Sequence, residues 1–252
     1  MATLPSPVPE QSAQPEAWAS SLAAIVSAPA PATIADVIAR MRAIDGLLPD
    51  SDGLKWFNKL YLMVTHQVDE NPPGGAWQDP TWLLHLDVVF AGLYFSAIRT
   101  YLAGACTPEA WVVLFESRFN GQIEHIQFAL AGMNAHINRD LAIALDQTNA
   151  DLNRDPAPDG PEHADYLAVN TLLDTVMPAA MAMLSAGPLG EAAEVSGKVG
   201  RLISSFDIYA ARNAAWDFAN VLCDLGGAVR DAALTAQDVS TGELGRTLLG
   251  AV

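Results

Sequence analysis

Apolar residues recur every three or four positions along most of this chain, and this spacing predicts α-helices. The longest such segment runs from Gln122 to Thr148. When its residues are placed about 100° apart, one stripe of the helix surface is apolar. That stripe consists of Ile123, Ile126, Leu130, Met133, Ile137, Leu141 and Leu145. We therefore expect one long helix through the middle of the domain.

Capping residues and prolines indicate where other helices begin. These residues are Thr33, Asp79 with Pro80, and Thr107 with Pro108. Another helix is predicted from about Asp52 to Glu70. Further helices are predicted over residues 163–185, 196–225 and 238–249. No segment alternates over a useful length with the two-residue period of a strand. The expected fold is a single all-α bundle of about seven or eight helices over residues 32–252.

The remaining N-terminal residues, 1–31, are rich in Pro, Ala, Ser and Gln and predict a flexible tail. They lack the basic and apolar regions of a signal peptide. The longest apolar stretch, Trp82 to Ile98, is interrupted by His85 and Asp87, so no membrane span is expected. A net charge of −16 disfavours partners such as nucleic acid or anionic membranes. These features predict a cytoplasmic protein, either a monomer or a homodimer.

Polar residues lie along both edges of the apolar stripe in the Gln122–Thr148 segment. One edge carries Gln127, Asn134 and Asn138, and the other carries His125, His136 and Asp140. Buried polar groups cost free energy unless they are hydrogen-bonded, so these side chains need partners or a role. His136 and Asp140 are four residues apart and hence neighbours on the helix. This spacing suits a carboxylate that orients an imidazole, or two ligands of one metal.

Two other predicted helices carry polar groups that could join this pair. Asp87 lies on the apolar face of the helix that begins at Pro80, together with Tyr94. In the 196–225 helix the inner face changes from apolar to polar. The residues there are Arg212, Asn213, Trp216 and Asp217. Two interpretations remain open at this point, an internal hydrogen-bond network between helices and a shared pocket.

Motifs of several common activities are absent from the sequence. It contains no GxGxxG after a strand, no GxxxxGK[ST], no GxSxG and no HExxH. The Glu-x-x-His pairs of di-iron bundles and the acid-rich metal motifs of terpene cyclases are also missing. Nucleotide-binding folds and these classes of enzyme are therefore disfavoured.

Four strings resemble a family of uncharacterised all-helical bacterial proteins, mainly actinobacterial. They are FNKLYLMVT from Phe57, LDVVFAGLYF from Leu86, GMNAHINRDL from Gly132 and ARNAAW from Ala211. The hallmark of the family is GMNAHIN-x-DL, and the resemblance covers about residues 35–225. It implies a shared fold and no particular activity. It also implies a shared pocket built on Asp87, Asn134, His136, Asn138, Asp140 and Arg212.

The hypothesis that we favour is a cofactor-independent enzyme of bacterial metabolism, secondary metabolism included. It would perform redox-neutral acid–base chemistry on a small, largely apolar metabolite, as a cyclase, isomerase, lyase or hydrolase. His136 would be the general acid or base, Asp140 would orient it, and Asp87 would be a buried carboxylate of raised pKa. The residues expected to contact the substrate are Asn134 and Asn138 at a polarised oxygen, with Tyr94, Arg212, Asn213 and Trp216 around it.

Two alternatives come from other classes of protein. In the first, a divalent metal is bound by His136, Asp140 and Asp87, with Asp217 as a fourth ligand. In the second, the protein is not a catalyst but binds a ligand or a partner, and its buried polar groups fix the register of the helices.

Overall fold

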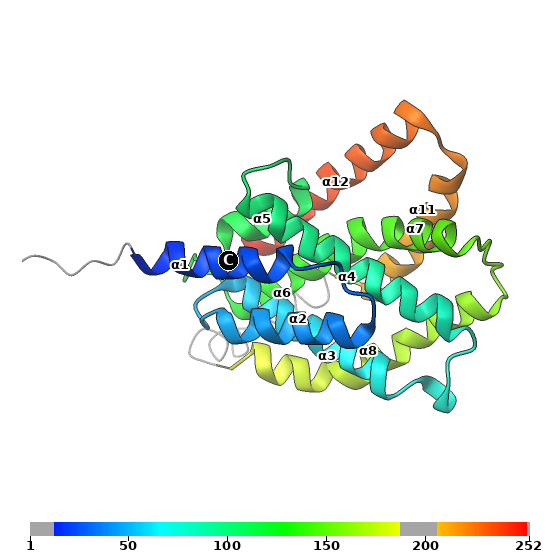
Figure 1. The fold of residues 1–252 in the computed structure, drawn as a ribbon, viewed down its shortest axis with the longest axis horizontal. Helices are drawn as coiled ribbons and strands as arrows, with labels where there is room; N and C mark the ends of the chain where they lie inside the picture. The colour runs from blue at the N-terminus through cyan, green and yellow to red at the C-terminus, as the bar shows by residue number, and fades with distance from the viewer. Residues whose placement is uncertain (1–12, 187–205, 251–252) are drawn as a thin grey trace, which may run out of the picture.

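A computed structural model shows the chain as a helical bundle (Figure 1). It describes residues 13–186 and 206–250, with side chains from residue 18 onward. Within these ranges all regular secondary structure is helical, which confirms the predicted all-α class. The structure has more helices than predicted, because a helix lies in the N-terminal segment and the central helix is divided.

The first three helices are α1 (Ala13–Ser27), α2 (Ile34–Leu47) and α3 (Gly53–Glu70). The cap predicted at Thr33 is present, and the structure adds a cap at Asp52. Thr33 and Asp36 form a reciprocal capping box at α2, and Asp52 accepts a hydrogen bond from the Leu54 amide at 3.0 Å. In α1, which contacts α2 and α4, Leu22 and Val26 are buried. Helix α1 thus lies within the segment predicted to be a flexible tail, and residues 1–12 of that segment lie outside the described residues.

The next elements are the 3₁₀ turn η1 (Pro73–Gly75), α4 (Pro80–Leu102) and α5 (Glu109–Ser117). Asp79 caps α4 as predicted, accepting from the Trp82 amide at 3.0 Å. The side chain of Thr107 does not cap α5. Instead, Asp238 accepts from the Glu109 and Ala110 amides at 2.8 and 3.1 Å. A carboxylate from a helix distant in sequence thus satisfies the free amides of this N-terminus.

The predicted central helix is divided into α6 (His125–Asn134), the π-helix η2 (Ala135–Asp140) and α7 (Leu141–Leu152). In η2 the Leu141 amide donates to the carbonyl of His136, five residues earlier. The wider π turn changes which faces the later residues occupy, so a uniform helical spacing does not hold across it. π turns of this kind are frequent at functional sites.

The last described helices are α8 (Pro161–Leu184), α11 (Ile208–Asp224) and α12 (Gly227–Gly250). Residues 196–205 of the helix predicted over 196–225 lie outside the described residues. Helix α12 is much longer than the predicted segment 238–249. In Figure 1 it runs from its junction with α11 back toward α5, and it packs against α5, α6 and η2.

Helices α4 and α8 are long and apolar enough to cross a membrane by length and composition alone. This evidence for a span is weak, because core helices of soluble proteins meet the same criterion. Both helices supply side chains to the interior of the bundle, including Trp82 and Tyr166, each no more than 1% exposed.

Candidate functional site

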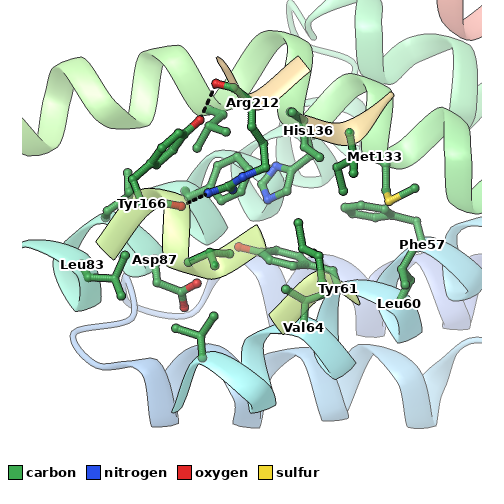
Figure 2. Close-up of a pocket in the computed structure, with 18 residues that line it drawn as sticks. Phe57, Leu60, Tyr61, Val64, Leu83, Asp87, Met133, His136, Tyr166 and Arg212 are labelled. Atoms are coloured by element: carbon green, nitrogen blue, oxygen red, sulfur yellow. Dashed lines mark hydrogen bonds between the residues drawn. The ribbon is translucent and has the colours of Figure 1, made fainter. Parts of the chain in front are cut away.

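A cavity of about 90 Å³ lies between α3, α4, α8, α11 and the central rod α6–η2–α7 (Figure 2). Most of its lining is apolar. The lining residues with polar groups are Tyr61, Asp87, His136, Tyr166 and Arg212. A space of this size holds several water molecules or a compact organic ligand. The sequence could not show that Asp87 and His136 meet, and the structure places both at this cavity.

His136 is anchored by Asp140, as the sequence spacing predicted. The distance from His136 Nδ1 to Asp140 Oδ2 is 3.2 Å. The same oxygen accepts from Trp111 Nε1 at 2.8 Å, and Arg139 pairs with Oδ1. The Asp140 side chain is completely buried. Because an ionised carboxylate only accepts, these hydrogen bonds assign the imidazole proton to Nδ1. Nε2 is then left with its lone pair.

The Nε2 atom of His136 is buried and has no hydrogen-bond partner among the described residues. The imidazole stacks on the ring of Phe90, with centroids 3.5 Å apart and an interplanar angle of 5°. Tyr61 meets it edge-on at 4.5 Å. Burial lowers the pKa of His136, and the hydrogen bond and charge of Asp140 oppose this shift only partly. The ring is therefore neutral near pH 7, with a basic nitrogen at the cavity.

Two further polar atoms at the cavity are buried without a partner among the described residues, Asp87 Oδ2 and the hydroxyl of Tyr61. Burial, reinforced by the charge of Asp69, raises the pKa of Asp87 to about 7. Burial, reinforced by the charges of Asp87 and Asp140, raises the pKa of Tyr61 well above its usual value. Figure 2 shows the Tyr61 hydroxyl directed toward the part of the cavity that holds Asp87. Near neutral pH these groups offer an acid and a hydrogen-bond donor.

Arg212 reaches the cavity from α11 and is only 6% exposed. Its Nε donates to Asn170 Oδ1 at 2.8 Å and its Nη2 to the carbonyl of Tyr166 at 2.6 Å. The Tyr166 hydroxyl returns a hydrogen bond to the Arg212 carbonyl, and the guanidinium lies 4.2 Å from the Tyr166 ring centroid. Burial lowers the pKa of Arg212, and Tyr166 opposes this shift. Figure 2 shows both hydrogen bonds between the two residues.

The two asparagines predicted to hold a substrate oxygen do not line this cavity. Asn134 Nδ2 donates to the carbonyl of Thr241 at 2.8 Å, and Asn138 Nδ2 donates to Asn134 Oδ1 at 2.9 Å. The carbonyl of Asn138 accepts from Gln237 of α12. This edge of the central rod therefore binds α12, a helix whose length the sequence pattern did not reveal.

Four other predicted residues lie away from the cavity lining. Tyr94 is buried behind it, and its hydroxyl donates to Asn58 Oδ1 at 3.3 Å. Trp216 packs between α4 and α8, 4.9 Å from the Tyr166 ring centroid. Asn213 and Asp217 are exposed, because the polar face of α11 points to solvent. Conversely, sequence reasoning missed Tyr61 and Tyr166 as site residues, since both resemble ordinary core aromatics.

The metal-ligand set considered from the sequence is not assembled. Asp217 is exposed, and both oxygens of Asp140 are engaged by protein donors. Within residues 13–186 and 206–250, no group of three His, Cys, Asp or Glu side chains could hold a metal ion.

The fold and cavity together define an all-helical protein with a buried His–Asp pair at an apolar internal space. Residues 34–251 match a family of unknown function, DUF5995, and the chain belongs to that family. Comparisons with curated proteins and with solved structures found no match. The family match confirms the resemblance to an uncharacterised family. It also extends past residue 225, so that α12 is part of the family domain.

Proposed function

We propose that the protein is a cofactor-independent enzyme that moves a proton within a small, largely apolar metabolite. The observation that carries the proposal is the state of His136. Its Nδ1 is fixed by a buried carboxylate, while Nε2 is kept without a protein partner at the wall of an apolar cavity. A buried, unpaired lone pair is unfavourable in the empty protein, so a bound substrate is its natural partner.

The other groups at the cavity suggest which residue acts as the base and which residues act as hydrogen-bond donors. His136 Nε2 would take a proton from a carbon next to a carbonyl group. Tyr61 and protonated Asp87 would donate hydrogen bonds to the carbonyl oxygen as negative charge develops on it. The proton would return at another carbon of the same molecule, so that the reaction is redox-neutral. Among the reaction types expected from the sequence, this arrangement favours isomerisation and cyclisation over hydrolysis, because apolar walls do not position a water molecule.

The proposed enzyme acts in the cytoplasm on a small substrate. The net charge of −16 supports a cytoplasmic enzyme of bacterial small-molecule metabolism rather than one that binds nucleic acid. The substrate would enter the bundle as a compact guest, since the cavity measures only about 90 Å³.

Hydrogen–deuterium exchange tests this proposal without knowledge of the natural substrate. Small cyclic and aryl ketones are incubated in D₂O with the protein, and loss of the protons next to the carbonyl is followed by NMR. We expect exchange with the wild type about 100-fold faster than with His136→Gln, the usual scale of general-base catalysis. His85→Gln is the matched control, because His85 is partly exposed and pairs with Asp151 outside the cavity.

Equal exchange rates for the wild type and His136→Gln, with both proteins folded and both binding the ketones, would contradict a catalytic role for His136. The cavity would then be a binding site without turnover. Far-UV circular dichroism of both variants controls for loss of the fold.

A further inference from the structure

Arg212 differs from the other buried arginine of the described residues in having no acidic partner. Arg118, which is 2% exposed, donates from Nε to Asp52 Oδ1 at 2.8 Å and also pairs with Oδ2. Arg212 donates only to neutral oxygens, those of Asn170 and Tyr166, and forms no ion pair within residues 13–186 and 206–250. Removing a guanidinium from water without a counter-ion costs free energy. A carboxylate in the cavity would offset more of this cost than neutral oxygens do.

The guanidinium of Arg212 is also fixed in an orientation that leaves N–H groups available for a ligand. Nε and Nη2 are fixed by α8, and the ring of Tyr166 supports one face of the group. Nη1 has no hydrogen-bond partner among the described residues, and Arg212 lines the cavity. An arginine oriented in this way presents free N–H groups that suit a carboxylate. Its orientation is set before binding, which reduces the entropy lost when a ligand pairs with it.

We infer that the ligand of this cavity is a small monocarboxylic acid whose carboxylate pairs with Arg212 and whose apolar body lies against Phe90 and Leu83. The inference rests on the proposed function, because it takes the cavity to be the substrate site. One carboxylate matches the single cation of the lining. A phosphate group would bring more negative charge into a cavity that also holds Asp87, and would exceed what one guanidinium balances. The carboxylate is the anchor, and a second functional group of the ligand meets His136.

The overall charge of the protein makes this inference easy to test. With a net charge of −16, the surface repels anions, so non-specific association would favour a neutral compound over its acid. A preference for a carboxylate over a neutral compound of the same shape would therefore show that a specific cationic side chain binds the carboxylate.

The experiment compares isobutyrate with isobutyramide and benzoate with benzamide, using protein-observed NMR titration at pH 6.5. We expect the wild type to bind each acid at least about tenfold more tightly than its amide. The Nε–H resonance of Arg212 should shift with the acids. Arg212→Gln should bring the two affinities to within about twofold of each other. Arg230→Gln is the matched control, because Arg230 pairs with Asp146 away from the cavity and its loss should leave the preference unchanged.

His136→Gln separates this inference from the proposed function. The variant loses the proposed base but keeps the cation, so it should lose proton exchange and retain the preference for acids. Wild-type protein that binds amides as tightly as acids, or binds no acid of the series, would overturn the inference while the exchange assay still decides the proposed function. If Arg212→Gln fails to fold, because Arg212 joins α11 to α8, the acid-to-amide ratio and the Arg212 resonance of the wild type decide the outcome.

Discussion

The imidazole of His136 and the carboxylate of Asp140 lie on the same π turn, with Nδ1 3.2 Å from Oδ2. Trp111 donates to the same oxygen, so the carboxylate is held in place from a second helix. This contact fixes the ring and its tautomer and leaves Nε2 at the cavity. A carboxylate that orients a histidine in this way is a common support for proton transfer.

Asp140→Asn should keep the tautomer of His136. Trp111 and Nδ1 share one oxygen of Asp140, so the amide oxygen takes this position and accepts from both, while the NH₂ group faces Arg139. The imidazole proton then stays on Nδ1, and Nε2 keeps its lone pair. We expect ¹⁵N NMR to show Nε2 unprotonated in the wild type and in the variant. A protonated Nε2 in the neutral imidazole of either protein would contradict the assigned hydrogen bonds.

The pKa of His136 should also fall further in Asp140→Asn. Burial lowers this pKa, while the hydrogen bond and charge of Asp140 raise it. Removal of the charge leaves the effect of burial opposed only by a hydrogen bond to a neutral oxygen. A proton NMR titration of the imidazole measures the change. An unchanged or higher pKa in the variant would show that Asp140 does not act on the ring.

Asp87→Asn should stabilise the protein at high pH and have little effect at low pH. The pKa of Asp87 is about 7 in the folded protein and 3.8 in the reference state, so the folded state holds a proton that the unfolded state has lost. Below about pH 4, Asp87 therefore does not lower the free energy of unfolding. As the pH rises from about 4 to 7, the contribution of Asp87 to this free energy is progressively lost. At pH 8 we expect the variant to exceed the wild type by about 2–4 kcal/mol, measured by urea unfolding.

Asp69→Asn is the matched control for this pH dependence. Asp69 is exposed and raises the pKa of Asp87 through its charge alone. Its replacement should produce only a small part of the gain at pH 8, because burial is the main cause of the shift. An Asp87→Asn gain that is the same at pH 4 and pH 8 would mean that Asp87 does not titrate abnormally.

Gly132→Ala should destabilise the fold and disturb the cavity wall. A Cβ atom at Gly132 would lie 2.3 Å from Cγ of Phe57, and Phe57 lines the cavity. We expect a loss of about 1–3 kcal/mol in unfolding free energy, the usual cost of overpacking. Gly92→Ala in α4 is the control, because nothing lies within 4 Å of its Cβ position. The control should gain about 0.5–1 kcal/mol from helix propensity. Equal effects at both sites would contradict the close approach of α3 to α6.

Asp238→Ala should weaken the contact between α12 and α5. Asp238 caps the Glu109 and Ala110 amides and pairs with Arg139 at 3.1 Å. Loss of a cap of this kind costs about 1–2 kcal/mol. Asp231→Ala on the same helix is the control and should stay within about 0.5 kcal/mol of the wild type, because Asp231 is exposed. A loss of the same size in both variants would show that the cap contributes nothing.

Local features of the sequence predicted the parts of this structure that depend on neighbouring residues. The caps at Thr33 and Asp79 follow from side chains that reach their own helix, and the His136–Asp140 pair follows from helical spacing. The π turn was not predicted, because a regular 3.6-residue period gives no sign of one extra residue in a turn.

Contacts between segments that are distant in the sequence could not be predicted from the sequence. Helix α12 has weak apolar periodicity and packs through small residues such as Gly242 and Gly245, which approach Glu109 and Asn134. Its true length was therefore missed, and with it the partners of Asn134 and Asn138. The role of Tyr61 was missed for a similar reason, since an inward aromatic reveals nothing about its hydroxyl until its neighbours are known.

If His136 is kept for a ligand rather than for the fold, its loss should not destabilise the protein. The free energy of unfolding of His136→Leu at pH 7 tests this directly. Leucine removes the unpartnered Nε2 from an apolar wall, and Asp140 keeps its contacts with Trp111 and Arg139. We predict a variant within about 1 kcal/mol of the wild type or more stable, since an unsatisfied buried polar group is itself costly. A loss of more than about 3 kcal/mol would contradict the account and mark the imidazole as part of the architecture.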